Sequence, residues 1–118
     1  MKHLNLTYER LLEILFEVWS EKSSTKYSPD NPALGQCGVT ALVVNDLLGG
    51  EILKTPLSEG WHFYNRINGQ VYGFTASQFR EEIQYKNILS NRDEAFADTN
   101  EQQYNYLRQA VINRVNES

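Results

Sequence analysis

The stretch NPALGQCGVTAL (residues 31–42) contains the only cysteine of the chain, Cys37, where a loop rich in Pro and Gly gives way to an apolar run. The run ends at Gly49-Gly50, a left-handed stop of the kind that terminates helices. Apolar residues surround nearly the whole circumference of a helix drawn over these positions, which is typical of a buried helix. We therefore expect a central buried helix that begins at Cys37 or one residue later. Its β-branched residues are mediocre helix formers, so a strand over 39–44 is the competing interpretation.

The length and composition indicate an ordinary globular chain. Its 118 residues, 41% hydrophobic and 22% charged, predict one domain over residues 1–118 that is large enough for a hydrophobic core without disulfide staples. The formal net charge of -4 and the absence of a basic cluster argue against a nucleic-acid partner. One cysteine excludes an intramolecular disulfide and a multi-cysteine zinc site, and we expect no cofactor and no metal.

The chain carries no recognisable targeting or membrane segment. Its first residues lack the apolar core of a signal peptide, and no apolar run approaches the length that spans a bilayer. A single cysteine also fits a reducing compartment. We therefore predict a soluble cytoplasmic protein without a membrane partner.

The remaining pattern predicts an α+β architecture. Thr7 is a plausible N-cap for a first helix, because its hydroxyl can accept a hydrogen bond from the first turn. A long polar loop follows that helix, and Thr99-Asn100-Glu101-Gln102 reads as a capping box that opens a last helix. The expected elements are a helix over 8–20, strands over 51–55, 61–67 and 70–75, a short helical piece over 76–82 and a further strand over 83–89.

Asn68-Gly69 gives the strongest short hairpin signal, a two-residue type I′ turn. If these are the two turn residues, Tyr64 pairs with Gly73 and His62 pairs with Thr75. Alternation then divides the hairpin into an apolar face, which we expect to cover a core, and a more polar face that carries His62. The apolar face would hold Trp61, Phe63, Asn65, Ile67, Gln70, Tyr72 and Phe74, and the polar face His62, Tyr64, Arg66, Val71, Gly73 and Thr75.

Three neighbouring features make Cys37 a candidate nucleophile rather than a small core residue, which is the usual role of a free cysteine. The N-terminus of a helix stabilises a thiolate through its partial positive charge. Gly35 and Gly38 bracket the cysteine and would let a substrate backbone approach closely. The side-chain amide of Gln36 could donate to a developing oxyanion.

A thiol nucleophile needs a base, and the chain has two histidines. His3 lies near the terminus and is most simply a surface residue. His62 lies on a predicted strand, where its ordinary role would be a half-buried ring hydrogen-bonded to backbone. The order of a Cys followed by a His on a strand is nevertheless that of papain-like and transglutaminase-like sites.

At this point the chain resembles a small bacterial family, the YunG-like proteins. The matching stretches cover about the middle half of the chain and are specific only as a set. The resemblance implies a compact papain-like or transglutaminase-like fold, in which Cys37 is the nucleophile and His62 the base. The stretches are NPALGQCGVTALVV (31–44), GGEILKT (49–55), WHFYNR (61–66), YGFT (72–75) and SQF (77–79).

The chain departs from the related motif at one position. The resemblance implies an Asp before Phe-Thr that would orient the imidazole, and this chain has Gly73 there. Glycine has no side chain to hold His62. The site could run as a Cys–His dyad with water, Asn65 or Asp46 holding the ring, although strand parity puts Asn65 on the other face. It could instead bind without turnover, or be an inactivated copy.

These features lead to three hypotheses about function. The first is a cysteine hydrolase or acyltransferase that attacks an amide or ester through a thioester, with the Cys37 amide and Gln36 as the oxyanion hole. The second is a pseudoenzyme whose cleft binds a peptide or small molecule. The third is a structural domain in which Cys37 is part of the core. The sequence leaves the substrate and the oligomeric state open.

Overall fold

The computed structural model describes residues 6–58, 60–79 and 82–117, and within them the predicted α+β architecture is confirmed. Four strands form an antiparallel sheet in the order β3-β2-β1-β4. The elements are α1 (Tyr8–Val18), α2 (Cys37–Leu48), β1 (Glu51–Leu57), β2 (Gly60–Ile67), β3 (Gln70–Tyr72), the 3₁₀ turn η1 (Ala76–Gln78), β4 (Ile88–Leu89), α3 (Arg92–Phe96) and α4 (Glu101–Glu117).

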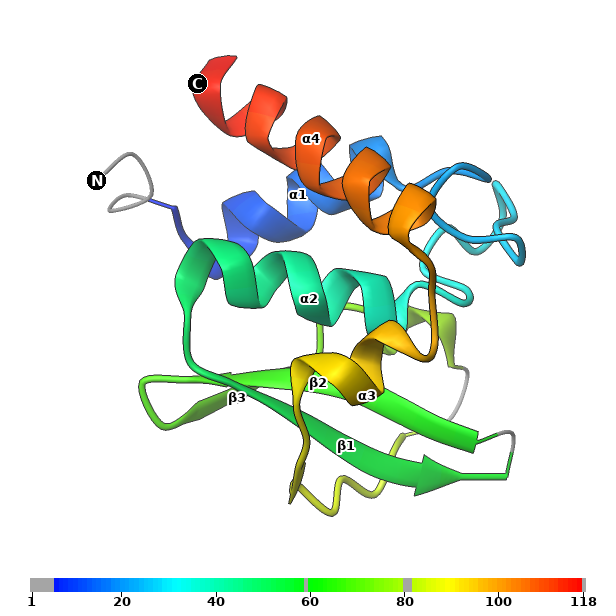
Figure 1. Cartoon of the computed structure of the whole chain (residues 1–118), viewed down its shortest axis with the longest axis vertical. Helices are drawn as coiled ribbons and strands as arrows, with labels where there is room; N and C mark the ends of the chain where they lie inside the picture. Colours follow the sequence, from blue (N-terminus) through cyan, green and yellow to red (C-terminus); the bar gives the residue numbers. More distant parts are fainter. Residues whose placement is uncertain (1–5, 59, 80–81, 118) are drawn as a thin grey trace.

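Helix α2 is the centre of the molecule. It lies between the sheet on one side and helices α1 and α4 on the other (Figure 1). Every residue from Cys37 to Val44 is buried. The strand interpretation of 39–44 is therefore wrong: burying a Val or Leu side chain contributes about 1.5–3 kcal/mol, whereas a β-branched residue in a helix costs at most about 0.7 kcal/mol.

The β2–β3 hairpin forms in the predicted register but is shorter than predicted. Ile67 pairs with Gln70 and Asn65 with Tyr72, and both turn residues have the positive φ of a type I′ turn. The strand stops at Tyr72, because the carbonyl of Gly73 accepts the N–H of Ala76 and turns the chain into η1. The predicted pairs beyond that point, including His62 with Thr75, are therefore absent from the register.

The two faces of β2 are less different than the alternation predicted. Phe63 and Asn65 lie under α2 as expected, and Asn65 donates to the carbonyl of Ala41 at 3.1 Å. His62 and Tyr64, on the predicted polar face, are also buried.

Residues 82–87 cover part of the face of β2 that carries His62 and Tyr64. This segment was predicted to belong to a strand over 83–89. Only Ile88–Leu89 pairs with β1, and the preceding residues run across the sheet instead. The Tyr64 hydroxyl donates to Asn87 Oδ1 at 2.9 Å and accepts the Asn87 N–H at 2.8 Å. These two hydrogen bonds hold the segment over the face that carries His62. Trp61, predicted on the core face, lies at the start of β2 and is instead 47% exposed.

The helix ends differ from prediction in small ways. Thr7 caps α1 as predicted, accepting the Arg10 N–H, but the helix ends at Val18 rather than at residue 20. Asn100, and not Thr99, caps α4 through its side-chain oxygen. Helix α3 was not predicted. The helical piece predicted over 76–82 is only the turn η1 among the described residues, with 80–81 outside them.

Candidate functional site

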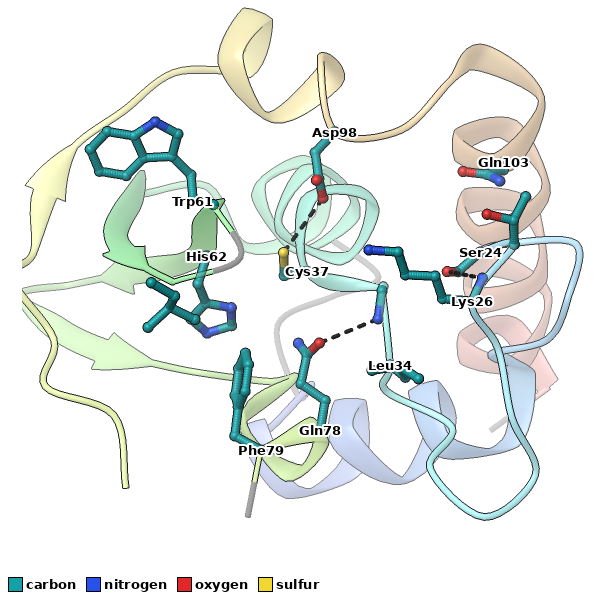
Figure 2. A pocket seen from close by; sticks show the side chains of 14 residues that line it. Ser24, Lys26, Leu34, Cys37, Trp61, His62, Gln78, Phe79, Asp98 and Gln103 are labelled. Carbon is teal, nitrogen blue, oxygen red and sulfur yellow. Dashed lines mark hydrogen bonds between the residues drawn. The ribbon is translucent and has the colours of Figure 1, made fainter. Parts of the chain in front are cut away.

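A pocket of about 210 Å³ lies where the start of α2, the start of β2, η1 and the loop before α2 meet. Cys37 and His62 both line it, so the fold brings the two predicted site residues to one cavity (Figure 2). His3 lies outside the described residues. The other lining residues include Ser24, Lys26, Gly35, Trp61, Gln78, Phe79, Asp98 and Gln103.

Cys37 is the first residue of α2, and its side chain is 9% exposed. Its Sγ lies 3.5 Å from Oδ2 of Asp98. Burial and the charge of Asp98 raise the pKa of the Cys37 thiol to about 12, although the backbone N–H of Phe63 acts in the opposite direction. The thiol is therefore protonated at neutral pH. The helix N-terminus, which we expected to favour the thiolate, is outweighed by desolvation and by a carboxylate that the sequence did not place there.

His62 is buried among aromatic rings. It is 1% exposed, with the ring of Phe79 edge-on at 5.0 Å and that of Tyr64 stacked at 5.7 Å between centroids. Burial lowers the pKa of His62 to about 4, so the imidazole is neutral at pH 7. Neither ring nitrogen has a hydrogen-bond partner among the described residues. Cys37 and His62 thus share a pocket without a hydrogen bond between them.

The two pKa values decide which protonation state the pair adopts. They are about 12 for the thiol and about 4 for the imidazole, so the proton stays on the sulfur in this arrangement. A thiolate–imidazolium pair is therefore not the ground state.

The side chain of Gln36 does not fit its predicted role as an oxyanion donor. It is fully buried, its Nε2 lies 3.5 Å from the carbonyl of Ser20, and Gln36 is not among the residues that line the pocket. Its backbone carbonyl accepts the N–H of Thr40 at the start of α2. Gln36 therefore ties the preceding loop to the helix. The amide side chains among the lining residues belong to Gln78 and Gln103.

Gly73, the position of the expected Asp, lies beside the aromatic cover of His62. A Cβ added to it would stand 2.9 Å from the hydroxyl of Tyr85, whose ring lies 6.1 Å from that of His62. A side chain at 73 would thus enter the group of rings around His62. The structure agrees with the predicted face of Gly73, even though the strand has ended before it.

Neither of the other candidates for holding the imidazole contacts it. Asn65 donates to a backbone carbonyl of α2 on the opposite face of β2. Asp46 lies near the far end of α2, where it accepts from the Tyr104 hydroxyl and pairs with Arg92 at 3.1 Å. Both side chains are used in packing elsewhere in the fold.

Asp98 is the site residue that the sequence analysis missed. Its Oδ2 accepts the N–H of Gly38 at 3.1 Å as well as facing the sulfur of Cys37, so it caps α2 from outside the helix. Desolvation raises the pKa of Asp98 against these stabilising hydrogen bonds. No local pattern identifies this role, because Asp98 lies in the loop after α3 and that helix was not predicted. An acidic residue just before a capping box was the only available signal.

Gly38 is crowded rather than open. A Cβ on it would stand 2.6 Å from Asp98 Oδ2 and 2.8 Å from the carbonyl of Ala95. Because Gly38 has no side chain, the loop after α3 can pack closely against the start of α2. We had expected a substrate to occupy this space.

The described residues contain no group of three or more His, Cys, Asp or Glu side chains placed to hold a metal ion. None of their helices combines the length and apolar character needed to cross a membrane.

Comparisons with known proteins identify relatives but no structural neighbour. A family model described as "YunG protein" matches residues 7–116. A protein of Bacillus subtilis (strain 168) described as "Uncharacterized protein YunG" is 53% identical over 108 residues, covering 92% of this chain and 94% of that protein. No solved structure matches.

Proposed function

Because the chain belongs to the YunG family, whose matched relative bears no functional description, we propose a function from the site itself: a cysteine hydrolase or acyltransferase acting on an amide or ester. The observation that carries this proposal is the shared pocket, which holds the only thiol of the chain beside a neutral, unpartnered imidazole. A neutral imidazole is the form of histidine that can accept a proton.

In the proposed reaction, Sγ of Cys37 attacks the carbonyl carbon, and the thiol proton passes to His62 as the S–C bond forms. The carbonyl π electrons move to oxygen and return when the C–N or C–O bond breaks. His62 then gives its proton to the departing amine or alcohol, leaving a thioester on Cys37. Water yields the acid and an amine yields the transfer product, and either restores the thiol.

The protonated ground state implies slow turnover. Transfer of the thiol proton to His62 is uphill, because the pKa of Cys37 lies well above that of His62, and this cost adds to the barrier. Substrate binding that draws the Cys37 sulfur away from Asp98 would lessen this cost. We therefore expect an activity well below that of an enzyme with a preformed thiolate.

We further propose that the fold is a compact papain-like or transglutaminase-like arrangement located in the cytoplasm. The features that support the fold are a cysteine at the first residue of a buried helix, an antiparallel sheet under that helix, and a histidine on the adjacent strand. The single cysteine supports a reducing compartment.

A second candidate function, a non-catalytic domain that binds a peptide or small molecule, has its own supporting observation. Burial and the charge of Asp98 hold the thiol in its protonated form, and Gly73 offers no group to orient His62. A pocket built this way would bind a ligand without forming a covalent intermediate.

Turnover separates the two candidates. We expect the wild-type chain to hydrolyse p-nitrophenyl acetate faster than Cys37→Ser and His62→Gln, with circular dichroism showing that each variant is folded. Transfer to an added amine such as glycinamide would distinguish an acyltransferase from a hydrolase. If all three proteins give the same rate, the enzyme proposal fails and the binding domain is favoured.

A further inference from the structure

Three buried polar atoms that line the pocket have no hydrogen-bond partner among the described residues. They are both ring nitrogens of His62 and Nε2 of Gln78. Buried polar groups are nearly always hydrogen-bonded. A cluster of unpartnered ones therefore indicates that a bound group supplies the missing hydrogen bonds. Figure 2 shows the His62 ring and the Gln78 amide beside the same gap, with Cys37 between that gap and Asp98.

The backbone around Gln78 fixes which end of its amide faces the pocket. The N–H of Gly35 donates to Oε1 of Gln78 at 3.3 Å, and the side chain of Asn31 donates to the backbone carbonyl of Gln78 at 3.1 Å. An N–H can pair only with the oxygen of the amide, so a flipped side chain would place two donors together. The NH₂ group of Gln78 is therefore the unpartnered end, and it presents a donor.

His62 complements that donor. A neutral imidazole carries one N–H and one bare nitrogen, so it can accept one hydrogen bond and donate another. Both of its nitrogens are buried and lack a partner among the described residues, so a bound group would supply their missing hydrogen bonds. The pocket thus offers one donor fixed on Gln78 and one acceptor on His62.

We propose that the pocket binds an uncharged carboxamide, with Gln78 Nε2 donating to its carbonyl oxygen and His62 accepting from its N–H. An amide presents this pair of groups on adjacent atoms, an ester lacks the N–H, and a carboxylate lacks it and carries a charge. Gln78 is then a substrate-binding residue contributed by η1, after the histidine in the chain.

The inference rests on the proposed function, since it names the substrate class of the same pocket. The proposed function leaves amides and esters open as substrates, and this inference selects amides. It also gives the carbonyl-binding role to Gln78, in place of the Gln36 side chain that packs against Ser20.

Alkylation of the only cysteine tests the proposal without any knowledge of the natural substrate. Iodoacetamide carries a primary amide, and methyl methanethiosulfonate is an uncharged thiol reagent without one. Dividing the first rate by the second cancels changes in the ionisation of Cys37. We expect Gln78→Glu, which keeps an acceptor for Gly35 but replaces the donor, to lower this ratio about fivefold to tenfold.

Gln103→Glu is the matched control. Gln103 lines the same pocket, and its Oε1 accepts from Thr99, so the substitution adds the same charge nearby without touching the proposed donor. We expect its ratio to stay within twofold of wild type. An unchanged ratio in Gln78→Glu, or an equal fall in Gln103→Glu, would overturn the proposal.

A second measurement needs only the wild-type chain and therefore does not depend on the folding of a variant. The ratio of the iodoacetamide rate to the methyl iodoacetate rate is compared with the same ratio for N-acetylcysteine. We expect Cys37 to favour the amide several-fold more than the free thiol does, because only the amide has an N–H for His62. Equal ratios would refute the role of His62.

The outcomes remain distinct from those of the proposed function. An amide preference without turnover would leave the amide pocket standing while refuting the enzyme. Hydrolysis of an ester without any amide preference would support the enzyme and refute the amide pocket.

Discussion

Replacing Asp98 with Asn should activate the Cys37 thiol. The substitution removes the negative charge that faces the sulfur at 3.5 Å and keeps an oxygen that can accept the N–H of Gly38. At that distance, repulsion between a thiolate and a carboxylate is about 1 kcal/mol in a water-like dielectric and about 5 kcal/mol in a surface-like protein dielectric. The Cys37 pKa should therefore fall from about 12 by about one to three units.

The expected change in reactivity is smaller than the change in ionisation. The thiolate fraction at pH 8 rises about tenfold to a thousandfold, but a thiolate of lower pKa is a weaker nucleophile, with a Brønsted slope of about 0.4–0.5. Alkylation should thus accelerate by about 3-fold to 30-fold. The rate is measured with iodoacetamide at pH 8 by intact mass, which reports Cys37 alone because it is the only cysteine.

Asp93→Asn is the control for this experiment. Asp93 is exposed on α3, close in sequence to Asp98, and the substitution removes the same charge away from the sulfur. We expect its alkylation rate to match that of wild type. A rate in Asp98→Asn equal to or below the wild-type rate, with the fold retained, would refute the contribution of the Asp98 charge to the raised pKa of Cys37.

Three further predictions concern stability. Gly38→Ala should destabilise the chain by about 1–3 kcal/mol in urea unfolding, because its Cβ would stand 2.6 Å from Asp98; a gain of stability, as at an ordinary helical glycine, would contradict the crowding. Tyr64→Phe should cost about 1–3 kcal/mol, because it removes two hydrogen bonds to Asn87 that each contribute about 0.5–1.5 kcal/mol, and a loss below about 0.5 kcal/mol would contradict this. The unfolded chain binds a proton at His62 near pH 6.5 and the folded chain only near pH 4, so stability should fall as pH drops through this interval, by up to about 3 kcal/mol more in wild type than in His62→Gln. Parallel pH profiles for the two proteins would refute the burial of an uncharged His62.

Much of the fold could be predicted from local sequence patterns. The Asn68-Gly69 turn predicted the hairpin and its register, and the unbroken apolar run after Cys37 predicted the buried helix. The pairing pattern could not show that β3 stops at Tyr72, since the turn that ends it depends on a hydrogen bond from Ala76 to Gly73.

The candidate site was predictable only in part. Cys37 and His62 were identified from their residue types and their order, and the fold places both at one pocket. The burial of His62 comes from Phe79 and from residues 82–87, which are long-range contacts that no period in the sequence marks. Asp98 and Gln78 likewise reach the pocket from segments that were predicted differently or not at all, so spacing along the chain gave no sign of them.

A catalytic Cys37 must pass through a thioester, which intact mass can detect. Wild type, Cys37→Ser and His62→Gln are mixed with excess p-nitrophenyl acetate, quenched in acid at short times and weighed intact. We expect an acetyl adduct on wild type that peptide mapping places on Cys37, that decays as acetate is released and that accumulates more slowly in His62→Gln. An adduct that is absent, or equal in all three proteins, would contradict a catalytic role for Cys37.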